Sequence, residues 1–160
     1  MYPYIVLLHV IGAFVFALAH GVSLAVSLRL RGVESRERAA ALLELSGMAI
    51  GGLYVGLLLL LVGGVWAGFA GDHWGRLWIW VALGILVVIV VAMYAIATPF
   101  YGRMRAAAGV TTDPKQLARY GEIAPDELDR MRASSRPIWL AVIGSVGLLV
   151  IVWLMVVKPF

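Results

Sequence analysis

The chain has 160 residues, of which 62% are hydrophobic and only 14% are charged, whereas soluble domains carry roughly 25% charged residues. It contains no cysteine, which excludes disulfides, thiolate metal sites and cysteine nucleophiles. The net charge of +4 does not indicate a nucleic-acid partner, because eleven of the thirteen basic residues lie in two segments between apolar runs, where membrane orientation explains them. We therefore expect an integral membrane protein whose partner is the lipid bilayer.

Four apolar runs are each long enough to cross a bilayer, which takes about 20 residues in a helix. They predict spans at about 3–28, 39–70, 77–101 and 137–157. Ser35 is a suitable N-cap for the second span, and Pro99 is expected to kink or end the third. The predicted fold class is all-α: a polytopic four-transmembrane-helix bundle that forms a single domain over residues 1–160.

A longer polar segment, residues 102–136, precedes the fourth span. At 112–114 and 124–127 it carries proline and acidic residues in the pattern of a helix start. We expect one or two short helices there, lying at the membrane surface. Basic residues are concentrated in 29–38 and 102–136, so the positive-inside rule places both loops in the cytoplasm and both termini outside.

Two histidines, His9 and His20, lie at membrane depth in a stretch from Tyr4 to Leu28 that has no charged residue. An ionisable residue inside a membrane is a functional hypothesis by default. The two are 11 residues apart, which is close to three helical turns, so they share a face and are separated by a rise of about 16 Å. One metal ion or haem iron cannot bind both, so each needs a partner from elsewhere.

Depth in the membrane suggests these partners, because His20 should lie near Met48 of the second span and Met93 of the third. Imidazole with a thioether is an axial ligand pair for haem, and both groups also suit copper. His73, in the turn at 71–76, would be the first histidine to meet a metal that arrives from outside. The candidate residues are His9, His20, Met48 and Met93 for a cofactor, and His73 and His9 for a metal. For both histidines of the first span, a buried hydrogen-bonding imidazole is the alternative.

The second span is rich in glycines four residues apart, a spacing that lets helix backbones approach closely in lipid. We expect these glycines to serve helix packing, and we also expect a homodimer through glycine faces. Glu44 is the only acid within an apolar run. We expect it to pair with Arg29 or Arg31, and a proton-relay carboxylate is the alternative. The sequence contains no HExxH, P-loop or Rossmann motif. Whether the chain is an enzyme therefore stays open; if it is one, it is a membrane oxidoreductase.

The segments LLHVIGA, GDHWGRLWIW and ATPFYGRMR, with a charged inner loop and a glycine-rich second span, resemble a bacterial group of four-span integral membrane proteins. That group is similar to the copper-resistance-D proteins and to the HemJ-type protoporphyrinogen oxidases. The resemblance covers most of the chain and implies a location in the bacterial inner membrane. It also implies a recurrent histidine early in the first span, which His9 matches, and a connection to haem or copper.

From the residues and the resemblance, we expect a membrane protein that holds a b-type haem for electron transfer, with His9 as the favoured ligand and His20 as the second. The first alternative is copper binding or uptake across the membrane. The second alternative is a non-catalytic accessory subunit of a larger membrane complex.

Overall fold

The computed structural model describes residues 1–121 and 123–160, and this part of the chain contains helices and no strand. The helices are α1 (Tyr2–Leu30), α2 (Arg36–Ala70), α3 (Leu77–Ala92), the π-helix η1 (Met93–Ala97), α4 (Thr98–Ala108), α5 (Pro114–Tyr120), α6 (Glu127–Ala133) and α7 (Arg136–Val157). Four helical stretches are long and apolar enough to cross a membrane: α1, α2, the continuous run from α3 to α4, and α7. The predicted all-α class with four candidate spans is confirmed.

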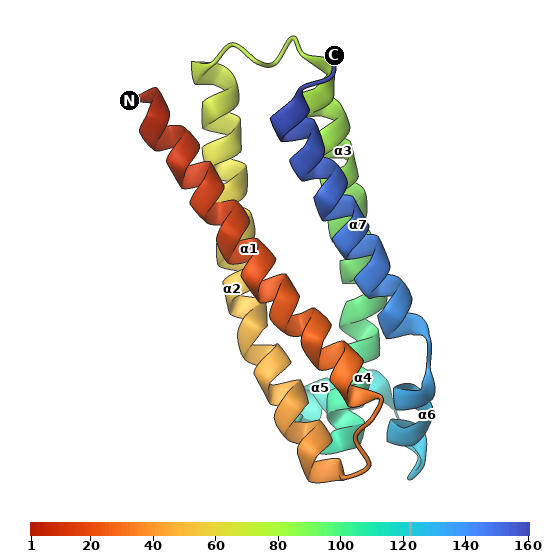
Figure 1. The fold of residues 1–160 in the computed structure, drawn as a ribbon. Helices are drawn as coiled ribbons and strands as arrows, with labels where there is room; N and C mark the ends of the chain where they lie inside the picture. Colours follow the sequence, from red (N-terminus) through yellow and green to blue (C-terminus); the bar gives the residue numbers. More distant parts are fainter. Residues whose placement is uncertain (122) are drawn as a thin grey trace.

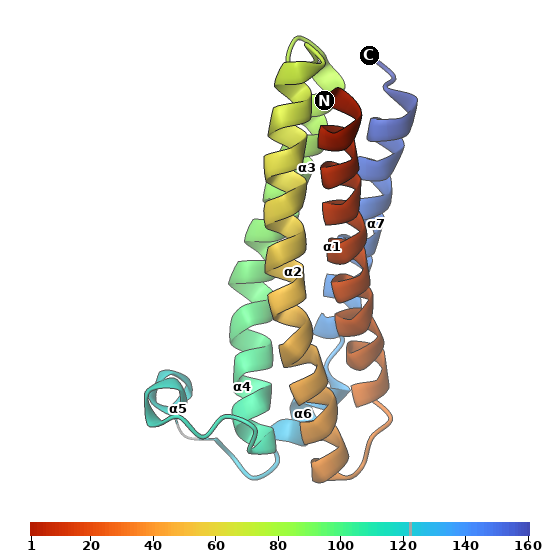
Figure 2. The ribbon, with the colours of Figure 1, turned by 90° about the vertical axis from the view of Figure 1, so that its left-hand side faces the viewer.

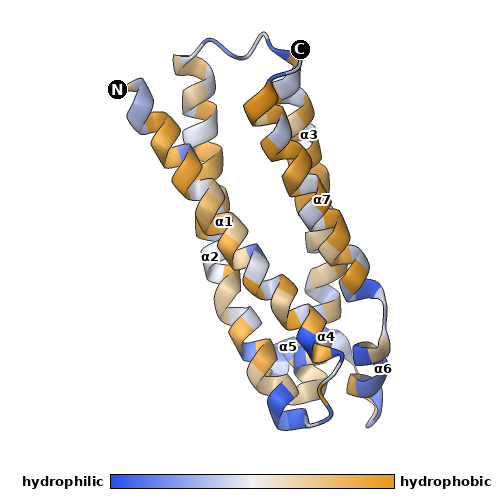
Figure 3. Cartoon of the chain, viewed as in Figure 1, coloured by the Kyte–Doolittle hydropathy of each residue, from blue (hydrophilic) through white to orange (hydrophobic). Residues whose placement is uncertain are grey.

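The bundle consists of two helix pairs, because α1 packs along α2 and α3 packs along α7 (Figures 1 and 2). Both termini lie at the same end as the loop between α2 and α3, which we call the terminal end (Figure 1). At the opposite end lie residues 29–38, 102–121 and 123–136, which we call the basic end. Hydrophobic residues cover most of the helical shafts, and hydrophilic residues gather towards the two ends, most densely at the basic end (Figure 3).

Helix boundaries follow the local sequence at the three predicted helix starts, because α2 begins after Ser35, α5 begins after Asp113 and α6 begins at Glu127. The Ser35 hydroxyl caps α2 by accepting a hydrogen bond from the backbone N–H of Arg38. Asp113 caps α5 in the same way, immediately before a proline at the first turn. The third span differs, because Pro99 does not end it: the chain continues as α4 to Ala108, beyond the predicted end at residue 101. The helix is irregular just before the proline, where it passes through η1. Pro99 lies in the first turn of α4, and the wider π turn before it relieves the clash that a proline ring makes in a regular helix.

α1 and α2 approach each other so closely that their backbones touch, because glycines face the partner helix. A Cβ at Gly56 would lie 2.5 Å from the backbone nitrogen of Phe16, and a Cβ at Gly12 would overlap the backbone of Leu60. In lipid, van der Waals packing at such small residues replaces the hydrophobic effect as the attraction between helices. The register of α1 against α2 is therefore set by backbone contact.

The same contacts show that several glycines of α2 serve packing within one chain, as the spacing predicts. Gly56 and Gly64 face α1, and Gly68 packs against Trp74 of the following loop. By contrast, a Cβ at Gly51 would meet no atom within 4 Å. Much of the glycine pattern thus serves packing within one chain, and the homodimer stays a prediction.

Buried apolar clusters close the bundle at its two ends. At the basic end, one cluster joins α1, α2, α4 and α6, and within it Leu43 and Met104 are the largest fully buried side chains. The other members of this cluster are Val26, Leu30, Ala39, Phe100, Ala107, Ala108, Leu128 and Met131. At the terminal end, a smaller cluster of Trp78, Ala82 and Leu154 joins α3 to α7. The basic end is therefore where the two helix pairs are held together.

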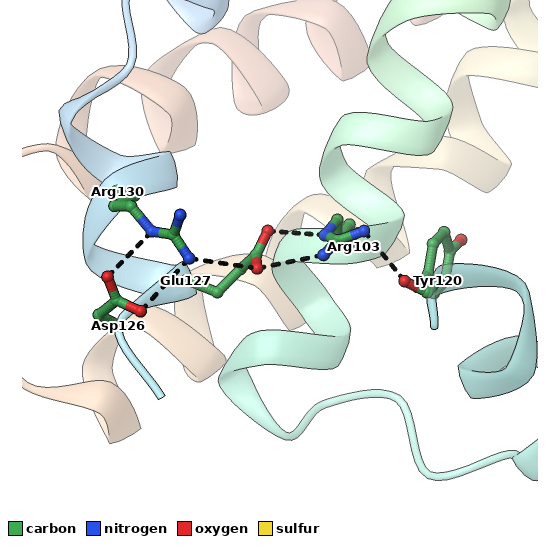
Figure 4. Close-up of polar contacts among 5 residues, drawn as sticks. All are labelled: Arg103, Tyr120, Asp126, Glu127 and Arg130. Carbon is green, nitrogen blue, oxygen red and sulfur yellow. Dashed lines mark hydrogen bonds and ion pairs between the residues drawn. The ribbon is translucent and has the colours of Figure 1, made fainter. Parts of the chain in front are cut away.

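An ion pair between Arg103 and Glu127 holds α6 against α4 at the basic end (Figure 4). Arg103 of α4 donates a hydrogen bond from Nε to the carboxylate of Glu127 at 2.6 Å and one from Nη1 to the carbonyl of Tyr120 at 3.0 Å. Arg130 pairs with Asp126 at 3.0 Å. The Glu127 side chain is only 14% exposed, and its hydrogen bonds from the Arg103 guanidinium hold the pKa of its carboxyl below its ordinary value.

Replacing Gly12 with alanine tests the backbone contact between α1 and α2. Gly12→Ala is expected to destabilise the protein by about 1–3 kcal/mol, because the added methyl group overlaps the α2 backbone. Gly21→Ala is the matched control on the same helix, since a Cβ there meets nothing within 4 Å; it should be neutral or raise stability by up to about 1 kcal/mol. Unfolding of the detergent-solubilised protein by SDS, followed by circular dichroism, measures both, and equal effects would contradict the contact.

The Glu127 pair predicts a pH dependence of stability. The folded-state pKa of Glu127 is lowered, so the contribution of the pair is complete above the unfolded-state pKa near 4.5 and is lost as pH falls through the lower, folded-state value. The free energy of unfolding in detergent should therefore fall on acidification below about pH 4.5 in the natural chain. Glu127→Gln should flatten this part of the profile, and an unchanged acid limb in this variant would show that another group causes it.

Candidate functional site

His9 lies in the contact between α1 and α2 and is a partnered polar group. Its Nδ1 lies 2.7 Å from the carbonyl oxygen of Leu60, and because a carbonyl only accepts, Nδ1–H is the donor. The ring rests against Gly64, where a Cβ would lie 2.8 Å from Nδ1. Gly64 leaves room for the imidazole, and the Leu60 carbonyl of α2 accepts the hydrogen bond from Nδ1–H.

His20 is half-buried where α1 meets α7, and one of its ring nitrogens lacks a hydrogen-bond partner in the part of the chain that the structure describes, unlike Nδ1 of His9. Its ring lies parallel to that of Phe16, one turn earlier, with ring centroids 6.4 Å apart. Its Nε2 is buried and has no hydrogen-bond partner among the described residues. A buried polar atom without a partner costs about 1–3 kcal/mol, and the bilayer core holds no water to supply one. Such an atom in a native structure needs an explanation.

A thioether side chain lies beside this unpaired nitrogen. A Cβ at Gly144 of α7 would lie 3.0 Å from His20 Nε2 and 2.8 Å from Met93 Cε. Both side chains therefore reach the same small volume, which only a glycine leaves open. Met93 is also the first residue of η1, and π turns are rare and frequently mark functional sites. The proximity of His20 to Met93 that depth predicts is present in the structure.

The remaining predicted ligands lie elsewhere. Met48 is 79% exposed on α2, so it takes no part in the buried contact at His20. His73 hydrogen-bonds to the Tyr2 hydroxyl at 3.1 Å in the loop of the terminal end. Tyr2 precedes His9 by two turns, or about 10 Å of rise, so His73 and His9 occupy different depths. The described residues contain no group of three or more His, Cys, Asp or Glu that could hold a metal ion.

Glu44 does not form the expected ion pair. Among the described residues it pairs with neither Arg29 nor Arg31. Glu44 lines a groove beside Arg36, whereas Arg29 lines a second groove together with Leu45. The carboxylate and the arginine thus face different sides of α2, which spacing along the chain alone does not reveal.

Three features of the site were missed by sequence reasoning: the stacking of Phe16, the π turn, and the opening at Gly144. No residue pattern marks a π turn, although Pro99, six residues after Met93, signals an irregular backbone nearby. Gly144 lies in the fourth span, and its pairing with His20 depends on how α7 is rotated. These features are tertiary, so a single span does not display them.

Leucine substitutions distinguish the two histidines by their effect on folding. His9→Leu is expected to destabilise the protein by about 1 kcal/mol, because it removes a hydrogen bond. His20→Leu should be neutral or stabilising, because it removes an unpaired buried nitrogen. Free energies of unfolding in detergent measure both, and a loss in His20→Leu as large as that in His9→Leu would reveal a partner for His20 in the folded protein.

Comparison with known proteins places the whole bundle in one family. Residues 3–159 match the model of a family described as "Predicted integral membrane protein (DUF2269)". No curated protein and no solved structure matches the chain, and the likeness to copper-resistance-D and HemJ-type proteins stays a prediction. The match spans nearly all of the chain and agrees with its four candidate spans. The chain therefore belongs to this family of integral membrane proteins.

Proposed function

We propose that the protein binds a soft monovalent metal ion, copper(I), inside the membrane through His20 Nε2 and Met93 Sδ. The observation that carries the proposal is the buried, unpaired Nε2 beside a thioether side chain. Imidazole and thioether are both copper ligands, and thioether selects the monovalent state. Because both ligands are neutral, a single positive charge is the smallest that a metal ion would bring into the bundle, where charge is costly.

The surrounding residues prepare the two ligands. Phe16, which is 8% exposed, stacks parallel to the imidazole and restricts its plane. The π turn at η1 sets the position of Met93, and Gly144 lets both side chains approach one point. Copper(I) itself would supply an acceptor for the lone pairs of nitrogen and sulfur, and the chain supplies their orientation and the exclusion of water.

A haem does not fit between His20 and Met93 as they stand. Both side chains come within 3.0 Å of one point beside the Gly144 backbone, which leaves no slot for a flat macrocycle. The two grooves described above lie at the basic end, near 28–45 and 36–44. The geometry at His20 therefore favours a bare ion over the haem that the sequence suggested first.

We also propose that the basic end faces the cytoplasm of a bacterial inner membrane. Eleven of the thirteen basic residues lie at this end, which is the distribution that the positive-inside rule associates with the cytoplasmic side. Both termini lie at the opposite end and would then be outside (Figure 1).

Anaerobic titration of the detergent-purified protein with copper(I), in competition with a chromogenic chelator, tests the metal site. The natural chain should bind one equivalent, and His20→Leu and Met93→Leu should each lower the affinity at least about tenfold, since even residues that only support ligands contribute 10–100-fold. Met48→Leu is the matched control, because it makes the same exchange at an exposed position and should bind like the natural chain.

Two outcomes would contradict the copper proposal. One is a natural chain that fails to compete with the chelator, and the other is equal affinity in all three variants. An absorption spectrum of the same sample from a haem-replete host adds a separate readout. A Soret band that is lost in His9→Leu but kept in Met93→Leu would indicate a haem bound through His9 and would contradict the copper site.

A further inference from the structure

We propose that a groove at the basic end, between the end of α1 and the start of α2, binds one anionic phospholipid. The groove has a volume of about 680 Å³. Its lining combines two arginines, Arg29 and Arg38, with the leucines Leu28, Leu42 and Leu45. This inference is independent of the metal site, because it rests on different residues at a different depth.

The two arginines are available for an external anion. Neither Arg29 nor Arg38 forms an ion pair or a side-chain hydrogen bond with a described residue. Arg130 and Arg132 of α6, by contrast, are engaged with carboxylates of their own helix or of its N-cap. Guanidinium groups bind phosphate through paired hydrogen bonds, so two free arginines at one groove form a receptor for a phosphate group.

Acidic residues are kept out of this groove by the rotation of α2. Arg38 and Leu45, seven residues apart, share the face that lines the groove. Glu37 and Glu44 also lie seven residues apart, but they line the neighbouring groove together with Arg36. The lining of the first groove therefore contains two positive charges and no carboxylate, and it is complementary to an anion.

The apolar part of the lining identifies the anion as an amphiphile. Leu28 is 54% exposed and Leu45 is 48% exposed, so both offer hydrocarbon surface at the groove. Arg29 directly follows Leu28, where the apolar run of α1 ends. The groove therefore crosses from the hydrocarbon layer to the headgroup layer, where a phospholipid presents both a phosphate and acyl chains. A free phosphate ion would leave the leucine surface without a partner.

One wall of the groove is anchored from the other half of the bundle. Arg132 of α6 donates a hydrogen bond to the carbonyl oxygen of Val33, which lies in the loop between α1 and α2. The Arg132 side chain is only 13% exposed and also pairs with Asp129. The loop is thus held in place without using the two arginines that face the lipid.

Native mass spectrometry of the detergent-purified chain, titrated with phosphatidylglycerol or phosphatidylcholine, tests the groove. The natural chain should retain one phosphatidylglycerol at concentrations where phosphatidylcholine is lost. The double variant Arg29→Gln/Arg38→Gln should bind phosphatidylglycerol about 25-fold more weakly, since each basic residue near a membrane surface contributes about fivefold.

The matched control is Lys115→Gln/Arg119→Gln, which removes the same two charges from exposed positions on α5. It should retain phosphatidylglycerol like the natural chain, and all variants should elute as the same species in size exclusion. If both double variants lose phosphatidylglycerol equally, net charge explains the binding and the groove does not. If both retain the lipid like the natural chain, the proposed site is contradicted. Displacement of the lipid by millimolar inorganic phosphate would identify a site for the free ion and overturn the lipid assignment.

Discussion

The backbone contact between α1 and α2 is the constraint on which the rest of the bundle depends. Glycines at Gly12 and Gly56 allow the two helices to touch, and in lipid such contact is the main source of helix association. Once this contact is made, the rotation and height of α1 are fixed. His9 is thereby presented to the α2 backbone, while His20 is carried to the place where α1 meets α7.

The two histidines of α1 differ in their hydrogen bonding, because Nδ1 of His9 has a partner and Nε2 of His20 has none among the described residues. The sequence places His9 and His20 on one face, yet they meet different neighbours because α1 contacts both α2 and α7. His9 finds a carbonyl, whereas His20 finds a thioether and a glycine. The first arrangement accounts for a histidine inside a membrane by packing alone. The second leaves a nitrogen lone pair beside a soft ligand, which packing does not explain.

Local features of the fold could be predicted from the sequence, and features set by helix rotation could not. The four spans and the cap at Ser35 follow from composition and from one hydroxyl. The choice of Met93 over Met48 as the neighbour of His20 could not be made, since both lie at a suitable depth and only rotation turns Met48 outward. The failed pairing of Glu44 has the same origin. The π turn escaped prediction because no residue pattern marks it, although Pro99 lies nearby.

X-ray absorption at the copper K-edge, on the protein loaded with one equivalent of copper(I), tests the copper site directly. We expect one sulfur and one nitrogen ligand from the chain, with the sulfur signal lost in Met93→Leu and the imidazole signal lost in His20→Leu. The metal site would be contradicted if the protein retained no copper. It would also be contradicted if the copper had no sulfur ligand and its ligands were the same in both variants. The unpaired nitrogen of His20 would then be a tolerated defect of packing.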